Sequence, residues 1–163
     1  MLLKTLFAGL LLFCLQSAYA DTFEGYVTHI TDGDTLTLVD AQKRQHKIRI
    51  DGIDAPERVQ PFGSESHSNL ARLTFQKNAT AECRKRDKEG LMRCKISVDG
   101  RDIGLQQIAD GLAWLMLQKD GHAQSSEDRA IYMQAETMAK LRRSGLWSQT
   151  NPSPPWDWKK LSR

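Results

Sequence analysis

Three short β-strand patterns follow one another near the start of the chain, with only tight turns between them. Residues 23–31, 35–39 and 45–53 carry apolar and β-branched side chains at strand spacing. Asp32-Gly33 is a tight-turn signal between the first two patterns, and a polar turn over residues 40–44 separates the second from the third. Because the connections are so short, this stretch predicts a β-meander.

The rest of the chain predicts two more strands and three helices. The predicted strands cover residues 79–83 and 92–98, and the predicted helices cover residues 64–77, 103–110 and 127–143. The last helix has an amphipathic stripe made of Ile131, Ala135, Met138 and Leu141. The unbroken apolar run over residues 112–117 is expected in the core. This inventory favours an α+β, mainly β fold: an OB-fold barrel of five strands with about three helices packed beside it.

The two ends of the chain are expected to lie outside the barrel domain. Residues 1–20 combine Lys4, a short apolar run and an A-x-A cleavage site ending at Ala20, a pattern typical of a secretory signal peptide. We therefore expect an exported protein, periplasmic or secreted, with no membrane association after cleavage. Residues 21–148 would form the domain. Residues 149–163 would be an irregular Pro- and Trp-containing tail, which Trp156 and Trp158 could dock to the body.

Cysteine content and net charge narrow the possible functions. Cys83 and Cys94 remain after cleavage, and an even pair in an oxidising compartment predicts a disulfide, with two buried thiols as the alternative. The four histidines lack ligand spacing with the cysteines, which argues against a zinc site. Removing the leader leaves 22 basic and 20 acidic residues. The resulting net charge of +2 is too small to indicate nucleic-acid binding by itself.

Acidic side chains and one arginine gather within the meander and just after it. Asp34 opens one predicted strand, Arg49 lies in the next, and Asp54 and Glu57 follow it. Carboxylates are hard oxygen ligands for Ca²⁺ or Mg²⁺, and an arginine beside them suits a phosphodiester. Strict alternation would place Arg49 and Asp54 on opposite faces, and Gly52 would permit a bend that re-aims the strand end. The alternative is that these acids are ordinary turn residues.

Two sequence blocks carry these residues: Asp32-Gly33-Asp34-Thr35, and Arg49 followed after four residues by Asp54-x-Pro56-Glu57. Their order resembles the staphylococcal (micrococcal) nuclease family, the thermonuclease-like domains. Further motifs extend the resemblance over nearly the whole chain after the leader: Asp87-Lys88-x-Gly90, Asp99-Gly100, Gly111-Leu112-Ala113, Gly145-Leu146-Trp147 and Pro155-Trp156-Asp157-Trp158. The resemblance implies an OB-type barrel with three helices, in agreement with the inventory above.

The resemblance also implies an activity and a role for each residue. The activity is Ca²⁺-dependent hydrolysis of DNA and RNA. Asp34 and Asp54 would be side-chain ligands of Ca²⁺, and position 55 would supply a backbone carbonyl, so Ala55 in place of the family's usual threonine should matter little. Glu57 would orient or deprotonate the attacking water. Arg49 would bind the phosphate and stabilise charge in the transition state.

The chain departs from the family pattern in the segment after Cys83. The family has a tyrosine and a second phosphate-binding arginine where this chain has Glu89 and Leu91, and another nucleotide-contacting tyrosine falls on Leu117. The candidate replacements, which would bind substrate, are Arg84, Arg86, Lys88 and Arg93. The alternative for this charged run is a solvated hairpin loop. If Cys83 and Cys94 form a disulfide, the bond links the two ends of this charged loop.

Three functions are compatible with these observations. The first is an exported Ca²⁺-dependent nuclease, expected to be a monomer, that acts on the backbone of DNA, RNA or both with low sequence specificity. The second is a nuclease-fold module that binds nucleic acid but cleaves it weakly or not at all, which the missing arginine and tyrosines favour. The third is a small exported barrel whose acids only form turns. The length of the family resemblance argues against the third.

Overall fold

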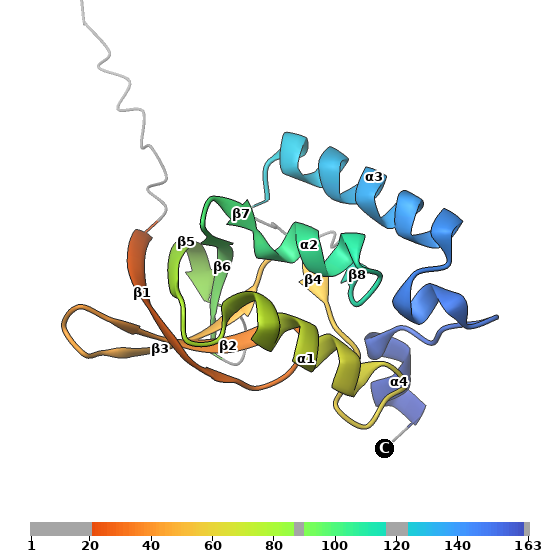
Figure 1. The fold of residues 1–163 in the computed structure, drawn as a ribbon, viewed down its shortest axis with the longest axis horizontal. Helices are drawn as coiled ribbons and strands as arrows, with labels where there is room; N and C mark the ends of the chain where they lie inside the picture. The colour runs from red at the N-terminus through yellow and green to blue at the C-terminus, as the bar shows by residue number, and fades with distance from the viewer. Residues whose placement is uncertain (1–20, 87–89, 117–123, 162–163) are drawn as a thin grey trace, which may run out of the picture.

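The five predicted strands form a closed barrel in the computed structural model, which describes residues 21–86, 90–116 and 124–161 (Figure 1). The barrel strands are β1 (Asp21–Ile30), β2 (Thr35–Asp40), β3 (Gln45–Ile50), β5 (Asn78–Arg86) and β6 (Met92–Val98). They pair in the order β3-β2-β1-β5-β6, and a parallel pairing of β3 with β6 closes the barrel. The short β7 (Arg101–Asp102) extends the edge beyond β6. The predicted OB-like, mainly β architecture is confirmed.

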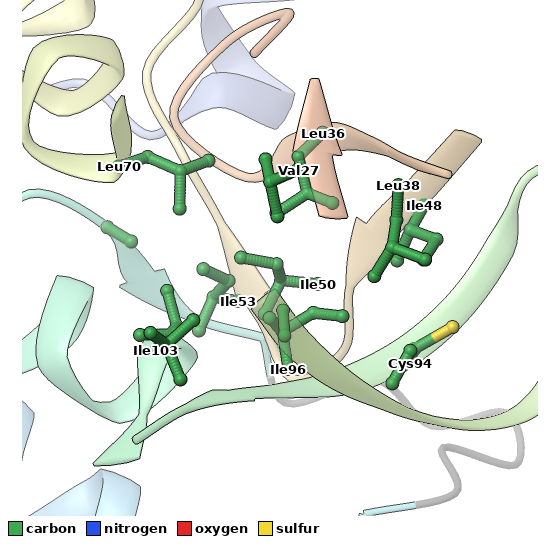
Figure 2. Packing of buried hydrophobic residues seen from close by; sticks show 14 of the residues in the cluster. Val27, Leu36, Leu38, Ile48, Ile50, Ile53, Leu70, Cys94, Ile96 and Ile103 are labelled. Atoms are coloured by element: carbon green, nitrogen blue, oxygen red, sulfur yellow. The ribbon is translucent and has the colours of Figure 1, made fainter. Parts of the chain in front are cut away.

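Alternation along the strands builds the core. Leu36 and Leu38 of β2 and Ile48 and Ile50 of β3 are fully buried, whereas the residues between them are more exposed or polar. Figure 2 shows Ile50 of β3 close to Ile96 of β6 and Ile53, inside the barrel. Burial of these branched side chains is the main force that holds the barrel closed.

Four α-helices and one 3₁₀ turn surround this barrel within the described residues: α1 (Gly63–Thr74), α2 (Ile103–Ala109), α3 (Ser126–Arg142), η1 (Gly145–Ser148) and α4 (Pro155–Leu161). Helix α2 lies between α1 and α3 (Figure 1). Side-chain caps fix two helix starts, since Asp102 accepts from the N–H of Leu105 and Ser125 accepts from the N–H of Asp128. The first three helices confirm the predicted ones to within a few residues.

The face that α3 turns to the core differs from the predicted stripe. Ala135 is partly buried against the core as predicted, but Ile131, Met138 and Leu141 are exposed, Leu141 by 73%. The buried residues are Tyr132 and Ala139. Polar contacts fix this rotation of the helix. The Tyr132 hydroxyl donates to Asp102 at 2.8 Å, and Glu136 accepts from the N–H of Leu115 at 3.0 Å. Each contact satisfies a polar group that burial would otherwise leave unpaired, which outweighs the exposure of the apolar stripe.

The C-terminal tail was expected to be irregular, and that expectation is wrong for residues 155–161. These residues form α4, which begins at Pro155. Proline is favoured in the first turn of a helix because its φ angle is already helical and the missing N–H has no partner there. Backbone N–H groups of Asp157 and Trp158 donate to the Pro154 carbonyl as the helix starts. The tail is therefore an ordered element beside the loop that leads into α1 (Figure 1).

The predicted disulfide joins Cys83 of β5 to Cys94 of β6. The two residues are direct partners in the antiparallel pairing, so the bond staples the base of the connection between these strands. Residues 87–89 of that connection and the predicted leader, residues 1–20, lie outside the described residues. Within the part of the chain that the structure describes, no helix combines the length and the apolar character needed to cross a bilayer.

Candidate functional site

Asp34 is held at the start of β2 by a turn that needs a glycine. The Asp34 N–H donates to the Asp32 carboxylate at 3.1 Å, which forms the turn. A Cβ atom on Gly33 would lie 1.9 Å from Ser66 Oγ and 2.8 Å from the Ala55 Cβ, so no larger residue fits. Gln107 of α2 donates to the Gly33 carbonyl at 2.7 Å. Helices α1 and α2 therefore fix the backbone that presents Asp34.

Asp34 is buried, with 5% of the residue exposed, and its carboxylate has partners on both oxygens. Thr35 Oγ1 donates to Oδ1 at 2.6 Å, and the Ala55 N–H donates to Oδ2 at 3.2 Å. Arg49 Nε lies 3.9 Å from Asp34 Oδ1. Thr35 and Arg49 are register partners across β2 and β3, which explains why sequence-distant residues meet here. The structure thus brings the predicted aspartate and arginine together.

Gly52 redirects the chain so that Asp54 joins the same cluster. Its φ angle of 78° is in the left-handed region that glycine adopts without strain. After this turn the chain leaves β3 and forms β4 (Ile53–Asp54), which pairs with β8 (Trp114–Leu115). The predicted bend at Gly52 is confirmed. Without it, strand alternation would direct Asp54 away from Arg49.

Burial and nearby negative charge raise the pKa of both aspartates. Burial raises the pKa of Asp34 well above its usual range, and the nearby charges of Asp32 and Asp54 raise it further. Burial likewise raises the pKa of Asp54 to about 6, although Lys159 and Arg49 act in the opposite direction. The two carboxylates are partly removed from water and lie close enough to repel each other. A bound cation would offset this repulsion and favour the charged form of both.

The donor set fits a hard metal ion. Within the described residues, no three His, Cys, Asp or Glu side chains gather closely enough to hold a metal by themselves. The Asp34 and Asp54 pair would thus supply only part of the six to eight oxygens that Ca²⁺ takes, with carbonyls and water completing the shell. Ala55 is buried beside this pair and gives its N–H to Asp34. The predicted role of its carbonyl stays a prediction.

Glu57 lies in the loop before α1, held by two partners. Its N–H donates to Gln60 Oε1 at 3.2 Å, and its carboxylate Oε1 accepts from Lys159 Nζ at 2.8 Å. The Lys159 contact was not predicted from the sequence. Burial alone would lower the pKa of Lys159, but the hydrogen bond to Glu57 and the charge of Asp54 raise it overall. Lys159 is therefore a cation at the edge of the acid cluster.

Of the candidate substrate-binding residues, only Arg93 has a side chain that the structure describes. Arg93 is the register partner of Arg49 across the parallel β3–β6 pairing, and its charge acts on Asp54. It is 8% exposed, with Nη1 4.0 Å from Asp51 Oδ1. Arg84 and Arg86 lie in β5, but their side chains are outside what is described. The same holds for the whole of residues Lys88, Glu89 and Leu117.

Replacing Asp54 with asparagine should stabilise the metal-free protein at pH 8. Folding raises the pKa of Asp54 from 3.8 to about 6, so the folded state tolerates the protonated carboxyl better than the charged one. The folded state is therefore not penalised below pH 3.8, and it loses stability as pH rises through about 6 and the buried carboxylate becomes charged. Removing the charge should therefore increase the free energy of unfolding at pH 8 by on the order of 1–2 kcal/mol, with no gain at pH 4. Denaturant unfolding in chelator measures this. A variant less stable than wild type at pH 8 would contradict the stated pKa.

The barrel and the cluster of acids and arginine beside it are typical of one class of protein. A closed five-stranded barrel brings together the buried Asp34 at the start of β2, Arg49 of β3, the half-buried Asp54 of β4 and Glu57 in the loop that follows. Carboxylates that can hold a cation, next to an arginine that can hold an anion, make a site for a metal-dependent phosphodiesterase.

Comparison with known proteins identifies the family. The family model of staphylococcal nuclease homologues matches residues 47–149, which include Arg49, Asp54 and Glu57. An uncharacterized endonuclease of Haemophilus influenzae is 33% identical over 137 residues, covering 84% of this chain and 73% of that protein. A micrococcal nuclease of Shigella flexneri is 29% identical over 170 residues, covering 99% of this chain and 94% of that protein. The chain belongs to the staphylococcal nuclease family, and the expected enzyme class, a nuclease, is confirmed.

The relatives extend to plants. The staphylococcal-like nuclease CAN1 of Arabidopsis thaliana is 31% identical over 120 residues, which cover 74% of this chain. That match spans only 35% of the plant protein. The similarity there is therefore a similarity of one domain within a longer chain.

Proposed function

We propose that this protein is an exported, Ca²⁺-dependent nuclease that hydrolyses phosphodiester bonds of DNA, RNA or both with low sequence specificity. The observation that carries the proposal is the meeting of Asp34, Asp54 and Arg49, with Glu57 at the edge of the same cluster. Export rests on the predicted leader alone. N-terminal sequencing of the exported protein should begin at Asp21, and an intact Met1 would argue against export.

Asp34 and Asp54 would hold the metal ion, together with the Ala55 carbonyl. A bound Ca²⁺ would supply Lewis-acid polarisation of a phosphoryl oxygen. The protein's own contribution is preorganisation: Thr35 and the Ala55 N–H fix both oxygens of Asp34 before any ligand binds. A carboxylate that is already oriented does not have to be reorganised during the reaction.

Arg49 and Glu57 would act on the substrate. The Arg49 side chain is 24% exposed, so its guanidinium can reach a backbone phosphate while it stays anchored beside Asp34. It would stabilise the negative charge that grows on the phosphoryl oxygens as water attacks. Glu57, which is more exposed, would orient that water and accept its proton.

Low sequence specificity follows from what these residues recognise. Metal ligands, an arginine and a general base all act on the phosphate and the water, and phosphate contacts carry no direct sequence information. Without the predicted leader the chain has 22 basic and 20 acidic residues, and this net charge of +2 adds only a weak general attraction for nucleic acid. The substrate is therefore defined by its backbone rather than by its bases.

A second function is favoured by one specific observation. Leu91 stands where the family pattern has its second phosphate-binding arginine, and a hydrophobic side chain cannot take that role. A protein with one phosphate-binding arginine instead of two could bind nucleic acid and cleave it slowly. Among the candidate replacements, Arg93 is the one whose side chain lies within the described residues, and it is the register partner of Arg49 across the β3–β6 pairing. Its low exposure and its proximity to Asp51 favour a structural role instead.

Binding and cleavage measured together distinguish these functions. The chain from Asp21 to Arg163 is incubated with labelled single-stranded DNA and, separately, RNA in Ca²⁺, beside an Asp34→Asn variant checked for folding by circular dichroism. The nuclease account predicts cleavage by the wild type and a loss of about 100-fold or more in the variant. Binding without cleavage would support the module. Neither binding nor cleavage of either polymer would contradict both.

A further inference from the structure

Helix α4 brings one lysine to the edge of the acid cluster. Lys159 Nζ lies 2.8 Å from Glu57 Oε1, although the two residues are about a hundred positions apart in the sequence. The side chains are 51% and 38% exposed, and ion pairs between exposed groups contribute little to stability. The main consequence of this contact is therefore local: it restricts where the Glu57 carboxylate can lie.

A second, buried contact fixes the same geometry independently. Gln60 is 5% exposed, and its side chain bridges the two segments. Its Oε1 accepts from the Glu57 N–H, and its Nε2 donates to the Ser153 carbonyl in the tail. Pro155, at the start of α4, is also buried. The tail is thus linked through Gln60 to the backbone of Glu57 and through Lys159 to its carboxylate, and α4 lies beside this loop (Figure 1).

We propose that Lys159 is a positioning residue that holds the Glu57 carboxylate by one oxygen and leaves the other to accept a proton from water. The inference rests on the proposed role of Glu57. A general base must lie within hydrogen-bond reach of the water that it activates, and a free glutamate in a loop would sample several rotamers. Lys159 and the Gln60 bridge restrict that sampling before substrate binds. The C-terminal tail is then a functional part of the active site.

The opposite role for the same contact is autoinhibition. A lysine that occupies Glu57 Oε1 could block the carboxylate, and the tail would then have to move before catalysis. The two roles predict opposite signs when Lys159 is removed, so one substitution distinguishes them. Positioning predicts a slower enzyme and autoinhibition predicts a faster one.

The test is steady-state cleavage of a short oligonucleotide in saturating Ca²⁺ by the mature chain. Lys159→Ala should lower kcat by about tenfold and leave KM within about twofold, because an interaction with the base, and not with the substrate, is lost. Lys159→Arg should recover part of the rate. Lys160→Ala is the matched control, because Lys160 is 75% exposed, on the same helix, and pairs with Asp157. A rise in kcat, or an unchanged kcat, for Lys159→Ala would overturn the proposal.

A double-mutant cycle shows whether Lys159 acts through Glu57. In a Glu57→Gln background, Lys159→Ala should cause no further loss, because the positioned group is already gone. The same loss in both backgrounds, or a loss that lies in KM, would mean a direct contact with substrate phosphate and would overturn positioning. If Glu57→Gln alone keeps the full rate, the proposed function of Glu57 fails. If Glu57→Gln is inactive while Lys159→Ala equals wild type, only the positioning role fails.

Discussion

Replacing Glu57 with glutamine should lower kcat by about a thousandfold, within the range that general acid–base catalysis contributes. Glutamine keeps the size of the side chain and can keep the contact with Lys159, but it cannot accept a proton from water. The Asp34 and Asp54 pair is left in place, so Ca²⁺ affinity should change by less than about threefold. Single-turnover cleavage of a labelled oligonucleotide, with calorimetry for Ca²⁺, measures both quantities.

Glu65→Gln provides the control for this variant. Glu65 is an exposed acid in the first turn of α1, so the substitution makes the same change in charge a short distance along the chain. It should leave the cleavage rate unchanged. If Glu57→Gln cleaved at the wild-type rate while binding Ca²⁺ normally, Glu57 would not be the base.

Replacing Arg49 with alanine should lower kcat/KM by about 100- to 1,000-fold, the size expected when a charge that stabilises the transition state is removed. Arg49→Lys should recover little of this, because an ammonium group cannot reproduce the two parallel hydrogen bonds of a guanidinium to a phosphate. The loss should appear mainly in kcat. Arg49 also offsets the charge of Asp54, so folding and Ca²⁺ affinity have to be measured on the same preparation.

Arg44→Ala is the control for the loss of one positive charge. Arg44 is 68% exposed in the turn between β2 and β3 and pairs with Asp40, away from the acid cluster. Its removal should not change the cleavage rate. An Arg49→Ala variant as active as Arg44→Ala would show that the barrel arginine does not contact the reacting phosphate.

The barrel and the acid cluster could be predicted because their signals are local. Alternation at Leu36 and Leu38 marks the face of β2 that is buried, and β6 has the predicted bounds. Gly52 was the residue expected to bend the chain, and its left-handed φ angle is the bend observed. In each case the information lies within a few residues of the feature that it specifies.

The contacts of α3 and α4 could not be predicted because their partners are distant in the sequence. The spacing of apolar residues in α3 fits a buried stripe, but Tyr132 and Glu136 bind groups on other elements and set a different face. For α4, Pro155 at the first helical position is a local signal that could have revealed the helix. No local pattern could have indicated that Lys159 meets Glu57, because that contact depends on how the folded tail packs.

The most direct test of the proposed metal site is the cleavage rate of the wild-type chain from Asp21 to Arg163 as free Ca²⁺ is raised from a chelator-buffered zero to millimolar. We expect no cleavage in chelator, a saturable rise with Ca²⁺, and loss of that rise in Asp54→Asn. Cleavage at full rate in chelator, or an unchanged Ca²⁺ curve in Asp54→Asn, would contradict a metal site built on these two aspartates.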